Sequence, residues 1–172
     1  RGYEVVVIEA CHTHVALSTM RNKTDRNDAR GIAQLMRLGW FKVVHVKSLE
    51  AQRLRMLLGC RKLVLRKLVD VENEIRGTLR AFGLKVGSIS RGRFAARVMT
   101  LAEQADALIA ELVLRLLAVR ATLLVEYRRM HLLLVKETLG DPVCRRLMPL
   151  PGVGPVAALA FRTGVDDPHR FE

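Results

Sequence analysis

The chain has 172 residues, of which 50% are hydrophobic and only 5% aromatic. This length suits one domain or two small pieces of a larger protein, and the many Leu, Val and Ala residues favour long helices over a β-sandwich. The formal net charge is +12, and the stretch from Arg21 to Arg97 alone holds 19 basic and 6 acidic residues, a net charge of +13. A charge concentrated in one stretch indicates a polyanionic partner, most simply nucleic acid, rather than a generally basic surface.

The cysteines and the hydropathy pattern exclude several other classes. Cys11, Cys60 and Cys144 are far apart and odd in number, which excludes a disulfide framework and a CxxC metal site and fits a reducing cytosol. No signal peptide and no membrane-spanning apolar run are visible, so we expect no membrane partner. The run Cys-His-Thr-His at 11–14 has no second ligand pair at finger spacing, which favours an exposed loop over a zinc site.

The N-terminal part predicts one strand and two helices. Residues 3–8 (YEVVVI) contain a continuous β-branched run that is typical of a strand buried on both faces, with its partner strands expected upstream. A short helix is predicted at 14–20. A longer one is predicted at 24–38, because apolar residues recur there at helical spacing and Gly39 stands where a C-terminal glycine belongs. Residues 40–46 alternate weakly, which favours a short strand or an extended linker.

Two long amphipathic helices dominate the middle of the sequence. Ser48 is a predicted N-cap for a helix that runs to about Phe82, with an apolar stripe interleaved with basic side chains. Residues 83–93 contain three glycines and form the predicted break. A second long helix is predicted at 94–139, where no proline occurs; the alternative is a helix that is interrupted within this segment. The pattern predicts an antiparallel helical, coiled-coil-like hairpin, packed either on its own body or against a second copy.

The first motif that suggests chemistry is the run KTDRNDA. Asp25 and Asp28 stand three residues apart at a helix start and share one face, and such paired carboxylates suit Mg²⁺. In two-metal nucleases, carboxylates from separate segments hold the ions that act on the attacking and leaving oxygens. Lys23, Arg26 and Arg30 are then candidates for phosphate contacts. The alternative, which spacing alone favours, is helix capping with Asp25 as the N-cap and Asp28 as a first-turn charge.

The second motif is LPGVGPVAALA at 150–160, which lies between two apolar helical stretches. This outline is typical of a helix-hairpin-helix, in which a tight Gly-x-Gly turn, here Gly152 and Gly154, lets backbone amides approach a DNA phosphate. Such a unit binds the backbone without reading the base sequence. The alternative is an ordinary turn with Pro155 at the first helical position.

Three runs of this sequence resemble, in the same order, parts of the DEDD-type insertion-sequence transposases of bacteria. The run RNKTDRNDARGIAQLMRLGWFKVVHVKS is similar to the end of their N-terminal domain, LRKLVDVENEIRGTLRAFGLKVG to the helical segment that follows, and DPVCRRLMPLPGVGPVAALAFRTGVDDPHRF to the start of their C-terminal domain. The resemblance implies three parts, 1–47, 48–139 and 140–172. The implied fold is mostly α: a remnant of an RNase H-like α/β domain, the helical hairpin, and a helix-hairpin-helix-like segment.

The resemblance also implies site residues. The family has a RuvC-type metal site of four acids in the order Asp, Glu, Asp, Asp, and the last two correspond to Asp25 and Asp28 here. The first two lie upstream in the family, and Glu9 falls in a later strand than the family's Glu, so it is not an expected ligand. The family's nucleophilic serine lies well beyond its PGVGP element, a place that neither Ser88 nor Ser90 occupies.

The function that the resemblance implies is DNA transposition in the bacterial cytoplasm. The expected cofactor is Mg²⁺, and the expected partners are DNA, a structured guide RNA and further copies of the chain bound through the hairpin. Because two acids and the serine are missing, we expect the 172 residues alone to be inactive. The start at Arg1 without Met and the end without a helix stop signal predict that both ends are cuts within a longer protein. Two other classes stay open: a non-enzymatic nucleic-acid-binding module and a helical assembly protein.

Overall fold

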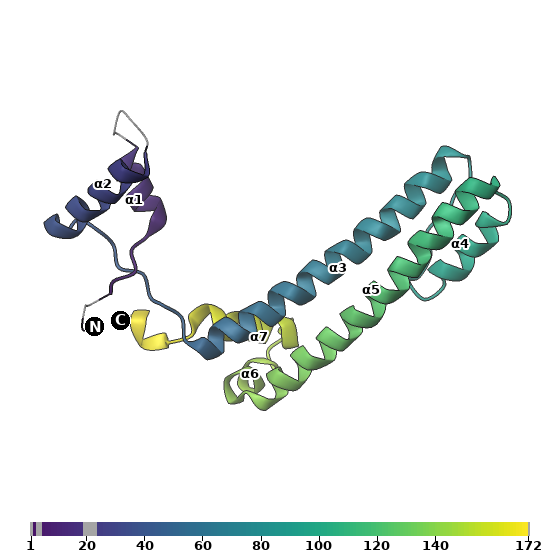
Figure 1. The fold of residues 1–172 in the computed structure, drawn as a ribbon. Coiled ribbons are helices and arrows are strands. Elements are labelled where there is room, and N and C mark those ends of the chain that lie inside the picture. Colours follow the sequence, from purple (N-terminus) through teal and green to yellow (C-terminus); the bar gives the residue numbers. More distant parts are fainter. Residues whose placement is uncertain (1, 3–4, 19–23, 172) are drawn as a thin grey trace. The chain divides into compact units, whose positions relative to one another are not determined.

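The computed structural model describes residues 2, 5–18 and 24–171, and most of these residues are helical. The chain divides into two units, residues 1–48 with 167–172 and residues 49–166. Among the described helices, none is long and apolar enough to cross a membrane. The helices are α1 (Ala10–Leu17), α2 (Asp25–Leu38), α3 (Leu49–Ala81), α4 (Phe94–Ala102), α5 (Ala107–Gly140), α6 (Pro142–Leu147), α7 (Pro155–Val165) and the 3₁₀-helix η1 (Pro168–Phe171) (Figure 1).

The predicted strand at 3–8 is wrong for the residues of it that the structure describes. An isolated antiparallel bridge joins Ile8 to Val43, and one backbone hydrogen bond on each side, of 2.8 and 2.9 Å, completes the pairing. Val5 is 85% exposed. A β-branched run gains stability from sheet neighbours rather than from its own backbone, and residues 40–46 supply one bridge to the described residues 5–8. Apart from Val43 in the bridge, residues 40–46 have no regular secondary structure, which agrees with the linker alternative rather than the strand.

α1 replaces a predicted loop. The Cys-His-Thr-His run at 11–14 lies inside this helix, which begins at Ala10 rather than at the predicted residue 14. Thr13 is the buried member of the run, and its hydroxyl donates a 2.8 Å hydrogen bond to the Glu9 carbonyl. The absence of glycine and proline from Ala10–Leu17 and this internal hydrogen bond explain why the segment is helical. The predicted end at residue 20 lies outside the described residues.

α2 confirms the helix predicted at 24–38. It ends at Gly39, whose φ of +65° is the left-handed conformation expected of a terminal glycine. The Gly39 amide donates to carbonyls of the last turn, so an otherwise orphaned helix end is satisfied. Gly31 and Leu35 form the buried side of the helix, and α1 is the helix that it contacts.

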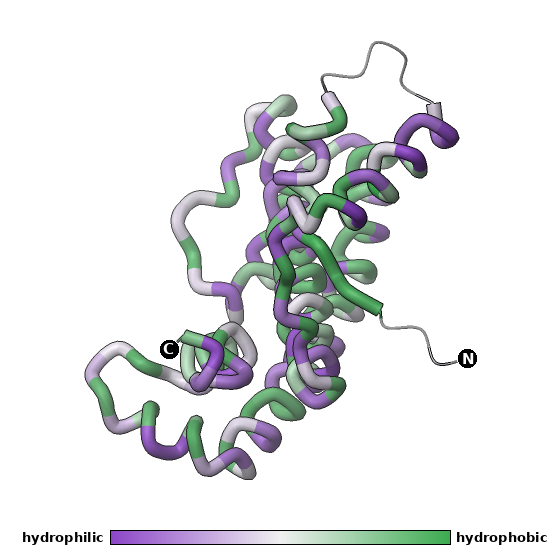
Figure 2. Tube along the Cα trace, turned by 90° about the vertical axis from the view of Figure 1, so that its left-hand side faces the viewer, coloured by the Kyte–Doolittle hydropathy of each residue, from purple (hydrophilic) through white to green (hydrophobic). Residues whose placement is uncertain are grey.

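The larger unit is organised by α3 and α5, which lie side by side and run in opposite directions (Figure 1). The helix predicted from Ser48 to Phe82 is confirmed as α3. The segment 94–139 is interrupted between α4 and α5, where the Asp106 carboxylate caps α5 by accepting a 2.9 Å hydrogen bond from the Leu108 amide. Hydrophobic and hydrophilic residues are interspersed along the chain (Figure 2). α5 buries Val113 and Leu134 but leaves other large apolar side chains, such as Leu132, exposed.

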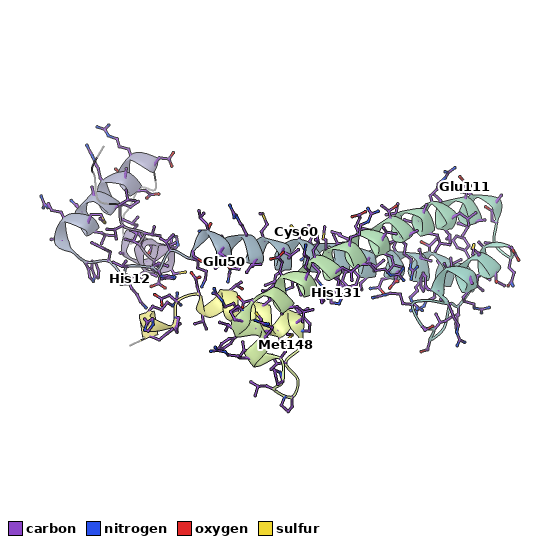
Figure 3. All side chains as sticks on the ribbon, turned by 90° about the horizontal axis from the view of Figure 1, so that it is seen from below. His12, Glu50, Cys60, Glu111, His131 and Met148 are labelled. Carbon is purple, nitrogen blue, oxygen red and sulfur yellow. The ribbon has the colours of Figure 1, made fainter. Side chains whose placement is uncertain are left out.

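Two hydrophobic cores stabilise this unit. The first lies where α3, α4 and the start of α5 meet, and Phe94 is its largest buried side chain. The second lies where α6 and α7 pack against α3 and α5. Between the cores, the Arg61 guanidinium donates to the Tyr127 hydroxyl at 2.8 Å and to His131 Nδ1 at 3.3 Å, which ties α3 to α5 through polar side chains; His131 is marked in Figure 3.

A buried ion pair joins the helices at the first core. Arg120 of α5 is only 4% exposed, and its guanidinium lies 2.8 Å from a Glu72 carboxylate oxygen on α3. It also donates a 2.9 Å hydrogen bond to the Arg91 carbonyl and lies over the Phe94 ring, 4.7 Å from the centroid. A buried charge is tolerated only when it is paired and hydrogen-bonded, and Arg120 meets both conditions.

The second core contains a polar contact that secures α6. The Asp141 carboxylate accepts a 2.8 Å hydrogen bond from the Cys144 amide, and Arg162 Nε lies 3.3 Å from its other oxygen without hydrogen-bond geometry. Burial by itself raises the pKa of Asp141, but the amide and the Arg162 charge outweigh it and lower the pKa below its ordinary value. Burial, with the Asp141 charge, raises the pKa of the Cys144 thiol to about 11, so this cysteine is a neutral core residue.

Replacing Arg120 by Met is expected to destabilise the chain by about 3 kcal/mol, because Glu72 then remains partly buried without its partner and the Arg91 carbonyl loses its donor. Urea denaturation followed by circular dichroism measures this change. Arg115→Met is the matched control on α5, since Arg115 is 81% exposed in its pair with Glu111 and its loss should cost at most about 0.5 kcal/mol. Equal losses from the two variants would contradict a structural role for the buried pair.

Asp141→Asn keeps a good N-cap for α6 but removes the charge that faces Arg162. A carboxylate whose pKa is lowered on folding stabilises the protein above its unfolded pKa, about 4, and this contribution is lost as the pH falls through the folded pKa. We therefore expect wild type to exceed the variant in stability by about 1 kcal/mol at pH 7, with the difference shrinking below about pH 4. Denaturation midpoints from pH 7 to pH 2.5 measure it, and a pH-independent difference would refute the charge interaction.

Candidate nucleic-acid interface

The acidic pair lies in the first turn of α2. The backbone of Thr24 is extended, and its hydroxyl accepts a 3.3 Å hydrogen bond from the Asn27 amide, so Thr24 is the N-cap. The capping alternative therefore fails for Asp25, whose backbone is already helical, because a capping residue must itself be non-helical. Asp28 occupies the first turn, as that alternative predicts, where the helix dipole favours a negative charge.

The described surroundings of the two carboxylates contain no charged partner for either of them. Asp25 is exposed and Asp28 half-buried, and neither forms an ion pair with another described residue. Asp28 is spaced from buried Gly31 and Leu35 by three and seven residues, so its carboxylate lies at the N-terminal edge of the inward face of α2.

Two exposed arginines, Arg26 and Arg30, stand on the same helix as the acidic pair. Lys23, the third predicted phosphate contact, lies outside the described residues. Within the described ranges, no group of three or more His, Cys, Asp or Glu side chains is placed to hold a metal ion. Magnesium sites often use only one or two protein carboxylates, with water and substrate phosphate completing the shell, so the Asp25–Asp28 pair fits as part of such a site.

Glu9, Ser88 and Ser90 lie away from this pair in the chain. The Glu9 carboxylate lies 4.0 Å from Lys42 Nζ in a partly exposed pair beside the β-bridge. Ser88 and Ser90 lie in the loop between α3 and α4. This loop contributes Val86 to the first core.

The Gly-x-Gly motif forms the turn between α6 and α7. Gly152 has a φ of +80°, which an L side chain rarely adopts, and the Val153 amide closes the turn on the Leu150 carbonyl at 3.0 Å. Gly154 has an ordinary extended conformation and is the N-cap of α7. Both glycines are exposed.

The start of α7 is open to a ligand. No side chain caps it, and Pro155 at its first position has no amide hydrogen. The remaining amides of the first turn lie at the positive end of the helix dipole, an arrangement that suits a phosphate oxygen. The turn rests on a rigid base, because Val153 and Val156 pack against the second core.

The sequence does not reveal one further basic site, formed by Arg76, Arg80 and Lys85 around the loop between α3 and α4. The four-residue spacing of Arg76 and Arg80 is the available signal, because it places both on one face of α3. Lys85 joins them only because the chain turns back after Gly83, which adopts a φ of +78°.

The chain is similar to known transposases over most of its length. Residues 1–83 match the DEDD transposase family of the IS110 type, whose model is described as Transposase. Over 170 residues the chain is 30% identical to the transposase for insertion sequence element IS1111A of Coxiella burnetii, an alignment that covers 92% of this chain and 44% of that protein. No solved structure gives a significant match.

Two further relatives carry similar names. The putative transposase y4pF/y4sB of Sinorhizobium fredii is 30% identical over 159 residues, with 88% of this chain and 40% of that protein covered. The probable family 20 transposase of Pseudomonas aeruginosa is 28% identical over 158 residues, with 87% and 46% covered. The chain thus spans less than half the length of these relatives. The resemblance carried by its three sequence runs is confirmed, and the chain is a relative of the DEDD-type insertion-sequence transposases.

Proposed function

We propose that this chain is part of an insertion-sequence transposase that cuts and rejoins DNA in a metal-dependent reaction. The observation that carries the proposal is the pair Asp25 and Asp28 in the first turn of α2, within the segment that matches the transposase family. Neither carboxylate has an ion-pair partner among the described residues. The names of the three relatives support the general activity, since each is called a transposase.

The proposed roles follow from the chemistry of each side chain. Asp25 and Asp28 would hold Mg²⁺ through their carboxylate oxygens, and the ion would activate the attacking oxygen and stabilise the leaving one. Arg26 and Arg30 would bind backbone phosphates and keep the DNA beside the carboxylates, a role that Lys23 would share. Because the pair is half of the family's acidic set, we expect the 172-residue chain alone not to cleave DNA.

The second proposed contact is the turn between α6 and α7. The exposed backbone at Gly152 and Gly154 and the uncapped first turn of α7 would accept a DNA phosphate, as in a helix-hairpin-helix. This contact would add affinity without sequence preference. It would lie in the opening part of the C-terminal domain, proposed as 140–172.

The hairpin, proposed as 48–139, is the candidate surface for assembly of subunits. Val125, Leu132 and Leu139 are exposed on α5 at seven-residue spacing, and this is the repeat that coiled-coil seams use. A homo-oligomer formed there would bring two copies of residues 1–47, the proposed RNase H-like part, to one DNA molecule. A structured guide RNA is the further partner that the proposal includes, and the basic stretch would serve its backbone as well.

A second candidate function is a non-enzymatic nucleic-acid-binding module. The net charge of +13 between Arg21 and Arg97 favours it, and it requires no metal site. The two functions differ in what they require of Asp25 and Asp28.

The variant D25N/D28N is expected to abolish divalent-metal binding at α2, because the amide side chains carry no charge for the ion. Titration of the isotope-labelled chain with Mn²⁺ should broaden the amide resonances of the first turn of α2 in wild type and not in the variant. D70N/E74Q, which removes two exposed carboxylates from α3, is the control and should leave this broadening unchanged. Broadening that is the same in all three proteins would favour the non-enzymatic module.

In a complete transposase that contains this sequence, Asp25→Asn is expected to lower transposition at least about 100-fold, since even outer-shell partners of metal ligands cost tenfold to 100-fold when lost. Transposition from a donor plasmid measures this change. Normal transposition with Asp25→Asn would remove the catalytic assignment.

A negative charge at Gly154 is expected to weaken DNA binding. Asp is a good N-cap, so Gly154→Asp should fold, and a Cβ at this position meets no atom within 4 Å. We expect duplex DNA affinity at 100 mM salt to fall at least about tenfold for G154D, because its carboxylate would repel the phosphate. G154N, a neutral cap of equal size, should lose only a few-fold. Equal affinity of G154D and G154N, measured by fluorescence anisotropy, would show that no phosphate binds there.

A further inference from the structure

A basic cavity lies at the end of the hairpin, beside the loop that joins α3 to α4. Its volume is about 460 Å³. It is lined by Arg76, Arg80, Lys85, Val86 and Gly87. Three of these five residues are cationic and none is acidic, so the cavity concentrates positive charge at one place on the surface.

The loop around this cavity is held by three arginines from three different helices. Each guanidinium donates to a loop carbonyl: Arg76 of α3 to Gly87 at 2.7 Å, Arg97 of α4 to Lys85 at 3.3 Å, and Arg120 of α5 to Arg91 at 2.9 Å. These three loop carbonyls already accept hydrogen bonds from guanidinium groups. Their negative ends therefore point at the arginines and would not repel an anion that enters the cavity. A loop fixed in this way also loses little conformational entropy when a ligand binds.

The other two cations of the cavity are not neutralised. Arg80 and Lys85 are exposed, and neither side chain has a hydrogen-bond or ion-pair partner among the described residues. Glu72, which precedes Arg76 by one helical turn, is already bound by Arg120 and Arg91. Three like charges around one cavity repel one another, and a bound anion would relieve that repulsion.

Gly87 makes room for such an anion. Its φ of +77° is a conformation that glycine adopts without strain, and a Cβ built there would meet no atom within 4 Å. The backbone at the cavity wall is therefore open to close approach. Arg76 is kept in place by its carbonyl contact and by the Phe94 ring, whose centroid lies 5.1 Å from the guanidinium carbon.

We propose that this cavity binds a phosphodiester group of a nucleic-acid backbone. Two guanidinium groups and one ammonium group can donate hydrogen bonds to the oxygens of a phosphate, and the cavity lies in the stretch that holds the whole charge excess of the chain. The site lies on elements other than α2 and α7, so it goes beyond the proposed function and does not depend on the carboxylates or on the glycine turn. It would let the hairpin hold nucleic acid as well as assemble subunits.

The test compares two double variants of the 172-residue chain, each of which removes two positive charges. One variant changes residues that line the cavity, and the other changes residues elsewhere on α3. R80Q/K85Q removes the two unpartnered cations but leaves the arginines that hold the loop. K62Q/R66Q, the control, removes two exposed cations of α3 that do not line the cavity. Binding of a 20-base-pair DNA duplex and of an RNA duplex of equal length is measured by fluorescence anisotropy between 50 and 300 mM salt.

For R80Q/K85Q we expect at least a roughly tenfold rise in Kd at 100 mM salt, and a salt slope reduced by about 2, because each lost phosphate contact removes about one released counterion. K62Q/R66Q should change Kd less than about threefold. Equal losses from the two variants would overturn the proposal, since they would show a diffuse field rather than a site. A loss with both polymers supports a shared backbone phosphate, and a loss with one polymer supports that polymer as the ligand.

A measurement on the wild-type chain tests the site even if the variant does not fold. Addition of either duplex should shift the Nε–Hε resonances of Arg76 and Arg80 and the amide of Gly87, and no shift of these signals at saturation would refute the site. The variants D25N/D28N and G154D should retain these shifts. Failure of the proposed transposase contacts is therefore distinguishable from failure of the cavity.

Discussion

The packing of α3 against α5 is the constraint on which the larger unit depends. Neither helix buries its apolar face alone, and each loop or short helix of this unit lies where it does because it covers one end of the pair. At one end of the pair, the buried Arg120 guanidinium needs hydrogen-bond acceptors. It donates to Glu72 on α3 and to the Arg91 carbonyl, and the second bond holds the loop between α3 and α4 in place. Charge burial thereby shapes a surface site.

In the smaller unit, local sequence signals rather than long-range packing define the main helix. α2 is specified by its own sequence, from Thr24 at its start to Gly39 at its end, and needs few neighbours to be defined. Its inward face is short, and Asp28 stands at the edge of that face rather than far from it. Asp28 is therefore half-buried, whereas Asp25, three residues earlier, is exposed.

Local signals predicted most of the helical fold, while features that need distant partners were not visible. Gly39 ends α2 in the predicted left-handed conformation, and α3 begins at the residue after Ser48. The strand predicted at 3–8 is absent from the described residues 5–8, because strand formation depends on neighbouring strands that periodicity does not report. Asp is a common N-cap residue, but α2 begins at Asp25 itself, so the preceding residue, Thr24, is the N-cap. The basic cavity could not be predicted from the sequence, because the loop beside it is held by a contact between residues 29 positions apart, Arg120 and Arg91.

The length of α3 sets a distance within the larger unit. Leu54 packs against the core beneath the glycine turn, and Arg76 lines the cavity at the other end. Their spacing of 22 positions corresponds to about 33 Å of helix. Because α3 is one uninterrupted helix, it separates the glycine turn from the basic cavity by about this distance along its axis.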